Sequence, residues 1–185
     1  MQVALVERAR AGDEEAFASL ARAAGDRLLA IAYRILRDLG LAEDAVQQTL
    51  VLAWRELPSL RDVDRFDAWL RRLLVHACYR EARRGRQWAT NVRALPIDQP
   101  ERSDEYNAVV DRDQLDRGFR RLPPEQRAVF VFHHYLGLTL IEVAAELGVP
   151  LGTVKSRLHY ATNTLRAAIE ADLRLPTDSS REHSA

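Results

Sequence analysis

Apolar residues recur every three or four positions along nearly the whole chain, which is the spacing of one face of an α-helix. The run Leu20, Leu28, Ile31 and Ile35 is a clear example within one amphipathic stretch. Nowhere do apolar and polar residues alternate over the length of a strand. The pattern therefore predicts an all-α protein, with helices over residues 3–11, 13–37, 42–57, 66–84, 115–122, 124–136, 139–147 and 151–171.

Glycine and proline mark where these helices end and where the chain changes character. Gly12, Pro58, Gly85, Gly137 and Gly148 each follow an apolar run and predict its end. The segment from about residue 86 to 107 is rich in acids, contains two prolines and lacks a helical stripe. We therefore expect two small helical domains, residues 1–86 and 111–172, with a flexible acidic linker over 87–110 and a disordered tail over 173–185.

The overall charge is balanced, with 27 Lys and Arg against 27 Asp and Glu, but the charges are segregated along the chain. No run of about 18 apolar residues is present, so no membrane insertion is expected. The first residues lack the apolar centre of a signal peptide. The single cysteine, Cys78, cannot form an internal disulfide. These features predict a cytoplasmic protein.

The stretch from Thr139 to Arg166 has the pattern of a helix-turn-helix. Thr139 and Glu142 form a T-x-x-E capping box at a helix start, and Gly148 suits the left-handed turn between two helices. No acid occurs from residue 151 to 169. The exposed face of the second helix carries donors and cations that suit a DNA major groove, namely Thr153, Lys155, Ser156, Arg157 and His159. The plainer interpretation is a helical hairpin with a solvated basic face.

The helix over residues 42–57 is predicted to present a mixed face opposite its apolar stripe. This face combines an acid, two amides, an apolar side chain and a cation: Asp44, Gln47, Gln48, Val51 and Arg55. An exposed valine among polar groups favours a protein-docking surface. An ordinary solvated helix face is the alternative.

The next helix, over residues 66–84, is strongly basic. Arg72, His76, Tyr79 or Arg80, and Arg83 fall on one stripe, and Arg84 is a further arginine of the same helix. Cations with an aromatic residue among them suit a nucleic-acid backbone with an unstacked base. One small domain thus combines a candidate docking face with a candidate DNA-binding face, which fits a bridge between a protein and DNA.

No arrangement of residues in the sequence indicates catalysis, a metal or a cofactor. His133 and His134 are adjacent, and adjacent helical residues point about 100° apart, so the two cannot easily share one ion. Cys78 stands in an apolar context without a recognisable histidine–acid partner. There is no glycine-rich phosphate loop. We expect a protein that is not an enzyme and that holds no cofactor.

Four segments together resemble the extracytoplasmic-function (ECF) group of the sigma-70 family, which are bacterial RNA polymerase initiation factors. LVERARAGDEEAFASL is similar to the family's opening, AEDAVQQTLVLAWREL to its region 2.2 and FDAWLRRLLVHACYREARR to its regions 2.3 and 2.4. LPPEQRAVFVFHHYLGLTLIEVAAELGVPLGTVKSRLHYATNTLR is similar to its region 4. The resemblance extends from about Leu5 to Ile169, in the family's order.

The resemblance implies a sigma factor that binds core RNA polymerase and directs initiation by recognising −10 and −35 promoter elements. Carried over by position, Asp44, Gln47, Gln48 and Val51 would meet the clamp helices of the largest polymerase subunit. The stripe of residues 72–84 would face the −10 DNA, and the loop of residues 58–64 would hold a flipped −10 base. Residues 153–159 would face the −35 major groove. The polymerase flap and an anti-sigma factor are further expected partners.

A helix-turn-helix regulator that binds duplex DNA without acting as a sigma factor is the alternative, but it would not account for the region 2 segments.

Three positions depart from the family's usual pattern. His76 stands where Asn is frequent, Arg80 where an acid is frequent and Pro150 where many members have Ser. The first two leave the −10 base preference open, and Pro150 replaces a side-chain cap by a rigid turn.

Overall fold

The computed structural model describes residues 2–93 and 110–173, and the regular elements within these ranges are all helical, which confirms the predicted all-α class. The N-terminal block contains α1 (Gln2–Arg10), α2 (Glu14–Leu36), α3 (Leu39–Glu56), the short turns η1 (Leu57–Ser59) and η2 (Val63–Arg65), and α4 (Phe66–Arg93). The C-terminal block contains α5 (Val110–Arg121), α6 (Pro124–Phe130), η3 (Val131–Tyr135), α7 (Leu140–Leu147) and α8 (Leu151–Leu173). The expected tail, apart from Leu173, and most of the expected linker lie outside the described residues.

Aspartate caps fix two helix starts in the N-terminal block. Asp13 Oδ1 accepts a hydrogen bond from the amide of Ala16 at 2.9 Å, and Asp38 Oδ1 accepts one from the amide of Leu41 at 2.9 Å. Such caps satisfy amides that have no partner within the helix. Because Asp38 is the cap, α3 begins at Leu39 and not at residue 42, so the connection to α2 is shorter than the sequence pattern predicted.

The predicted end of α4 at Gly85 is wrong, because the helix continues to Arg93. Gly85 lies inside α4, where a Cβ atom would be 3.4 Å from Leu41 Cδ1. An added Cβ atom would make an ordinary van der Waals contact there, so Gly85 marks the point where α4 passes the first turn of α3. A glycine inside a helix costs stability relative to alanine but does not end the helix by itself. The first part of the expected linker, residues 87–93, is consequently helical.

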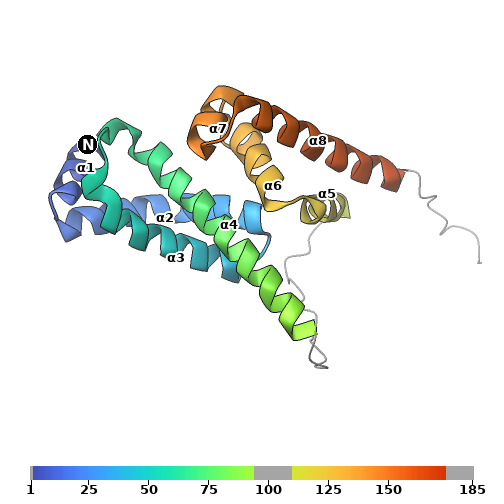
Figure 1. Cartoon of the computed structure of the whole chain (residues 1–185), viewed down its shortest axis with the longest axis horizontal. Helices are drawn as coiled ribbons and strands as arrows, with labels where there is room; N and C mark the ends of the chain where they lie inside the picture. Colours follow the sequence, from blue (N-terminus) through green and yellow to red (C-terminus); the bar gives the residue numbers. More distant parts are fainter. Residues whose placement is uncertain (1, 94–109, 174–185) are drawn as a thin grey trace, which may run out of the picture.

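The core of the N-terminal block forms where α2, α3 and α4 pack together (Figure 1). Leu28 and Ile31 from α2 and Leu74 from α4 are fully buried. On α3 the buried positions are mostly alanines, including Ala42 and Ala45. Small side chains at the contact bring helix axes close together, which explains how α3 fits between its longer neighbours.

The C-terminal block packs directly on the N-terminal block, and in Figure 1 α6 and α7 lie against α4. Val143 and Val154 belong to the same apolar cluster as Leu74. A second, smaller cluster joins α5 to α8 and consists of Leu122, Ala161 and Leu165, with Phe119 and Phe130 packed against it. The two blocks therefore share a continuous core. No helix within the described ranges has the length and apolar content that crossing a bilayer requires.

Candidate nucleic-acid interface

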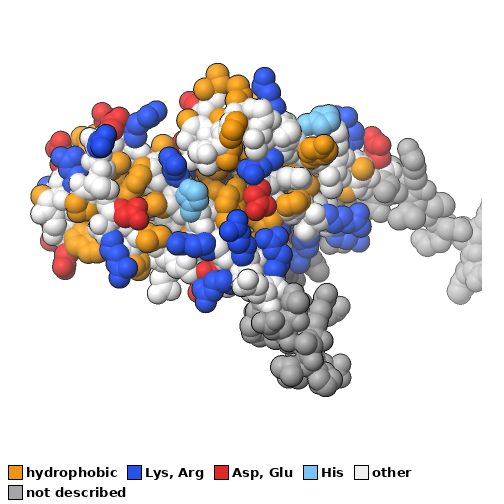
Figure 2. Space-filling view, viewed as in Figure 1, with side chains coloured by type: hydrophobic (Ala, Val, Ile, Leu, Met, Phe, Trp, Pro, Cys, Tyr) orange, Lys and Arg blue, Asp and Glu red, His pale blue; other side chains and the backbone are white. Residues whose placement is uncertain are grey.

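The basic stripe of α4 lies on the surface, as the sequence predicted for most of its members. Figure 2 shows Lys and Arg side chains gathered along the diagonal of α4. The exposed members are Arg72, His76, Arg80, Arg83 and Arg84. Burial, followed by the charges of Arg72 and Arg80, lowers the pKa of His76 below its usual value. His76 is therefore neutral at pH 7 and offers one donor and one acceptor to a ligand.

Tyr79 does not share this exposure. Its side chain is half-buried, and its hydroxyl is buried without a hydrogen-bond partner among the described residues. Burial raises the pKa of the Tyr79 phenol well above its usual value, and the charge of Arg157 on α8 acts in the opposite direction. The charge of Arg157 on the candidate −35 helix therefore acts on the phenol of Tyr79 in the other block.

Glu81 is a site residue that the sequence analysis missed. It is only 2% exposed. Its Oε1 accepts hydrogen bonds from the amide of Gln48 and, at 3.1 Å, from Nη1 of Arg84. A buried carboxylate needs such partners, because an unpaired charge away from water is costly. Glu81 thus connects α3 to α4. Its only signal in the sequence is an acid in the middle of the arginine-rich part of the helix.

The mixed face of α3 is largely exposed. Asp44, Gln47 and Arg55 are exposed, and Val51 is a large apolar side chain with 47% exposure. Gln48 of this face is half-buried and turned toward Glu81. The remaining face still has the mixed polar and apolar character of a docking surface.

The helix-turn-helix forms as predicted from its capping and turn residues. Thr139 Oγ1 accepts from the amide of Glu142 at 3.3 Å, and Glu142 Oε2 accepts from the amide of Thr139 at 2.7 Å, which completes the capping box. Gly148 has a φ of 65° and reverses the chain. The carbonyl of Pro150 accepts from the amides of Thr153 and Val154 at 2.9 and 3.2 Å, so α8 begins on this turn.

The candidate −35 residues lie along the first turns of α8. Lys155, Ser156 and His159 are exposed, whereas Thr153 and Arg157 are half-buried. Ser156 Oγ donates to the carbonyl of Thr153 at 3.0 Å, and His159 Nε2 lies 2.9 Å from the side-chain nitrogen of Asn163. These short contacts within the helix leave Lys155 as the most accessible cation of the set.

Two contacts join α4 to the helix-turn-helix. Arg71 Nε and Nη2 donate to Glu146 at 2.8 and 2.5 Å, and both side chains are mostly buried. This pairing raises the pKa of Arg71. Next to it, a Cβ atom at Gly148 would lie 3.0 Å from Nη2 of Arg72. The turn of the helix-turn-helix therefore packs against Arg72, the first residue of the basic stripe.

Two further contacts join α2 to the C-terminal block. The guanidinium of Arg34 lies over the ring of Tyr135, 3.8 Å from its centroid. Arg37 forms an ion pair with Asp116 of α5. No local sequence pattern indicates these pairs, because their members are separated by more than one predicted helix.

Within the described part of the chain, no group of three His, Cys, Asp or Glu side chains could hold a metal ion. His133 Nδ1 lies 2.8 Å from the carbonyl oxygen of Leu138, which fixes its ring on the following turn. Cys78 is fully buried, and burial raises the pKa of its thiol to about 12. The thiol is therefore protonated and shielded at neutral pH.

Comparison with known proteins gives matches in both blocks. Residues 20–89 match the family described as Sigma-70 region 2, and residues 112–165 match Sigma-70, region 4. The chain is 36% identical over 166 residues to the ECF RNA polymerase sigma factor SigL of Mycobacterium tuberculosis, with 86% of this chain and 94% of that protein covered. It is 33% identical over 164 residues to the RNA polymerase sigma-E factor of Streptomyces avermitilis, with 86% and 88% covered.

Solved structures give the same result at the level of the fold. CnrH, solved in complex with the cytosolic domain of CnrY, is similar with a TM-score of 0.62 and 27% identity, covering 92% of this chain and 98% of that one. The sigma factor RpoE of Bartonella quintana, solved with the anti-sigma factor NepR, is similar with a TM-score of 0.61 and 26% identity, covering 80% and 92%.

Proposed function

Because the chain belongs to the ECF group of RNA polymerase sigma factors, we propose that each of its two blocks recognises a different promoter element. The N-terminal block, residues 1–86 with the extension of α4, docks on core polymerase and binds the −10 element. The C-terminal block, residues 111–172, binds the −35 element. Membership of this family favours a sigma factor over a helix-turn-helix regulator that acts without polymerase.

The α3 face is the proposed contact with the clamp helices of the largest polymerase subunit. Asp44, Gln47 and Arg55 supply hydrogen bonds and charge, and the exposed Val51 supplies the apolar centre. Interfaces of this kind place an apolar core within a polar rim. Gln48 contributes by holding Glu81, and thereby α4, in a fixed position relative to the docked helix.

The α4 stripe is the proposed contact with the −10 DNA. Arg72, Arg80 and Arg83 are exposed cations along one helix, and such cations neutralise phosphates and release counterions. His76 is neutral at pH 7, so it would act on a base or sugar by hydrogen bonding and not by charge. Tyr79, which is half-buried, supplies an aromatic surface for an unstacked base.

The α8 helix is the proposed contact with the −35 major groove. Its exposed Lys155 and Ser156 stand near the helix start, the part of a recognition helix that meets base edges. Thr153, Arg157 and His159, on the same two turns of the helix, complete the proposed contact. The absence of acids from residue 151 to 169 keeps this surface compatible with phosphates.

Promoter binding requires the two blocks to separate. Elements centred about 25 base pairs apart lie roughly 85 Å apart along a straight duplex that rises about 3.4 Å per base pair. In the packed arrangement α4 and α8 contribute side chains to one core. One packed molecule therefore cannot reach both elements, and docking on polymerase would hold the blocks apart.

The observation that carries this proposal is the presence of a docking face and a basic face on adjacent helices of one small domain. Run-off transcription with purified core polymerase and a promoter library tests it. We expect transcripts from a restricted set of promoters, which Val51→Asp abolishes by placing a charge in the docking face. If core polymerase yields the same transcripts with and without the protein, the proposal is wrong.

Two further features of the proposal concern partners and location. CnrH was solved with the cytosolic domain of CnrY, and the Bartonella RpoE with the anti-sigma factor NepR. We propose that an anti-sigma factor likewise binds this chain. We also propose that the chain acts in the cytoplasm, where polymerase and promoters are found. No enzymatic activity is proposed, since the sigma factors to which it is similar are transcription factors. Copurification of the chain with a second protein from cells, abolished on induction of its promoters, tests the anti-sigma partner.

A further inference from the structure

Glu81 lies at the junction between the α3 face and the α4 stripe. Successive residues of an α-helix are rotated by about 100°, so Arg84 lies about 120° around α4 from Arg72 but only about 60° from Glu81. Arg83, in contrast, lies only about 20° from Arg72. Because Glu81 is on the side of α4 that contacts α3, Arg84 stands at the edge of the stripe nearest to the α3 face.

A single oxygen atom of Glu81 connects the two surfaces. Its Oε1 accepts a hydrogen bond from the side-chain amide of Gln48 on α3 and another, at 3.1 Å, from Nη1 of Arg84. The Glu81 side chain is 3% exposed, whereas that of Arg84 is 70% exposed. A nearly buried carboxylate thus holds one nitrogen of Arg84, while the rest of the guanidinium faces solvent.

The packing of α3 on α4 does not itself require a carboxylate at this position. The cluster to which both helices contribute is apolar, and Ala45 and Ala77 within it are fully buried. Burial of a carboxylate is costly, and apolar side chains of similar volume often pack as well or better. Glu81 is therefore better explained by the two side chains that it holds, one from each surface.

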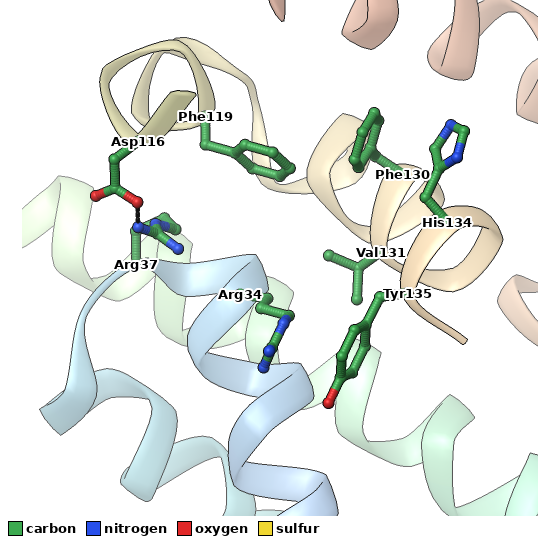
Figure 3. Close-up of a pocket in the computed structure, with 8 residues that line it drawn as sticks. All are labelled: Arg34, Arg37, Asp116, Phe119, Phe130, Val131, His134 and Tyr135. Atoms are coloured by element: carbon green, nitrogen blue, oxygen red, sulfur yellow. Dashed lines mark ion pairs between the residues drawn. The ribbon is translucent and has the colours of Figure 1, made fainter. Parts of the chain in front are cut away.

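The pair of Glu81 and Arg84 stays intact when the two blocks separate. Figure 3 shows the opposite case, in which Arg37 of α2 pairs with Asp116 of α5, so that this ion pair is lost when the blocks move apart. Glu81 and Arg84 both belong to α4, and Gln48 belongs to the neighbouring α3. The arrangement of these three side chains is therefore available to the separated form that binds promoter DNA.

A guanidinium that is held at one nitrogen is suited to a directed contact. Within the described residues, Nε and Nη2 of Arg84 make no hydrogen bond, and two such donors match the oxygens of a phosphate. Because the side chain is already restrained, it loses less conformational freedom when it binds. The adjacent carboxylate also offsets part of the arginine charge. Arg84 thus favours one fixed contact over unspecific attraction of DNA.

We propose that Glu81 is a positioning residue for −10 binding, which holds Arg84 so that its guanidinium binds one phosphate of single-stranded DNA beside the α3 face. Glu81 itself touches no DNA and acts through Arg84. Because Gln48 holds the same oxygen, the position of Arg84 is linked to the surface that docks on polymerase. This inference rests on the proposed function and adds to it a residue that neither contacts polymerase nor DNA.

Gln48→Glu combined with Glu81→Gln separates positioning from stability. This swap variant moves the carboxylate from α4 to α3, reverses the hydrogen bond between the helices and leaves the net charge unchanged. Its urea midpoint should stay close to that of the unmodified protein, because a side-chain hydrogen bond between the helices remains. Arg84 is then left with a neutral neighbour on α4, which binds a guanidinium less strongly than a carboxylate does.

Binding is measured by fluorescence anisotropy of the full chain with labelled single-stranded DNA of mixed sequence, at several salt concentrations. Arg84→Gln, at an exposed position, should weaken binding about threefold to tenfold. It should also lower the dependence of log affinity on log salt by about 0.7, the value for one phosphate contact with a single strand. The swap variant should lose affinity to a similar extent.

A double-mutant cycle shows whether Glu81 acts through Arg84. In the Arg84→Gln background, the swap should have no further effect on DNA affinity. Arg83→Gln is the matched control, because Arg83 is exposed and does not share the Glu81 oxygen. The swap should weaken binding by the same factor in Arg83→Gln as in the unmodified protein.

Four results would each overturn the inference. They are absence of binding to this DNA at low salt, unchanged affinity in Arg84→Gln, unchanged affinity in the swap variant, and an equal loss from the swap with and without Arg84→Gln. The last result would mean that Glu81 serves only the fold. None of these measurements uses polymerase, so promoter-directed run-off transcription would still test the sigma-factor proposal independently.

Discussion

Arg71 and Glu146, 75 residues apart in sequence, form a two-point ion pair that joins the two blocks, with donor–acceptor distances of 2.8 and 2.5 Å. Their side chains are 15% and 10% exposed. Ion pairs in such surroundings are weak evidence for overall stability, but removing one partner leaves a poorly solvated charge behind. The pair is therefore well suited to specify one packed arrangement of the blocks.

Arg71→Glu should open the contact between the blocks. Two carboxylates would then face each other where the ion pair stood, at a cost of about 3 kcal/mol to the packing of the blocks. The expected result is an increase in the radius of gyration measured by small-angle X-ray scattering, while the helical content stays constant. The reversed pair Arg71→Glu with Glu146→Arg should restore the compact form.

Arg27→Glu is the matched control for this experiment. Arg27 pairs with Asp67 at 2.7 Å, but both residues belong to the N-terminal block and are more exposed. An exposed pair contributes less than about 1 kcal/mol, and its removal should not change the radius of gyration. Equal expansion in Arg27→Glu and Arg71→Glu would contradict the assignment of Arg71 to the contact between the blocks.

The sequence predicted the helices and the helix-turn-helix well, because their signals are local. The capping box of Thr139 and Glu142 and the turn at Gly148 each depend on residues within a few positions of one another. Gly85 misled the prediction because α4 continues through it to Arg93. A local pattern cannot distinguish a glycine that ends a helix from one that lies inside it.

The sequence predicted those features of the candidate site that depend on the spacing of residues along a single helix. The stripe of α4 and the face of α8 followed from helical spacing. The inward turn of Gln48 depends on Glu81, which it meets only in the folded chain. The burial of the Tyr79 hydroxyl likewise depends on the packing around α4 and not on spacing along it. The packing of the two blocks is encoded in pairs such as Arg37 and Asp116, for which spacing along the chain carries no information.

Glu81→Gln should destabilise the N-terminal block. The carboxylate accepts from Gln48 and Arg84 while almost fully buried. A glutamine amide keeps one acceptor but places two donors among existing donors, which costs about 1–3 kcal/mol in the free energy of unfolding. Urea unfolding followed by circular dichroism measures this decrease. Glu43→Gln, on the exposed side of α3, should change stability by less than about 0.5 kcal/mol, and equal effects would argue against a special role for Glu81.

Cys78 should react with thiol reagents only when the core opens. With a pKa of about 12, roughly one thiol in ten thousand is ionised at pH 8, and the side chain is fully buried. The thiolate is the reactive form, so labelling by Ellman's reagent should be slow in buffer and should accelerate in Glu81→Gln. A cysteine introduced at the exposed Ala23 gives the rate for an unprotected thiol. Labelling of Cys78 at that rate would mean that the core is open in solution.

Lys155→Glu should weaken −35 recognition without affecting the docking of the protein on core polymerase. Lys155 is exposed near the start of α8, where its charge faces a bound duplex. Replacing it by an acid removes one favourable interaction, worth about 1–3 kcal/mol. We expect the affinity of the holoenzyme for promoter DNA, measured by fluorescence anisotropy, to fall by about ten- to hundredfold. If Lys155 binds a phosphate, the substitution should also lower the dependence of log affinity on log salt by about 0.9.

Glu170→Lys is the control for Lys155→Glu, because it changes the charge by an equal amount of opposite sign near the other end of α8. Promoter affinity should stay within about twofold in this variant, since longer-range charge effects are screened beyond about 10 Å. The affinity for core polymerase should be the same for both variants and the unmodified protein. If Lys155→Glu lowered the affinity for core polymerase as strongly as the affinity for DNA, the substitution would be disrupting the fold of the C-terminal block. The placement of Lys155 in the −35 groove would then be wrong.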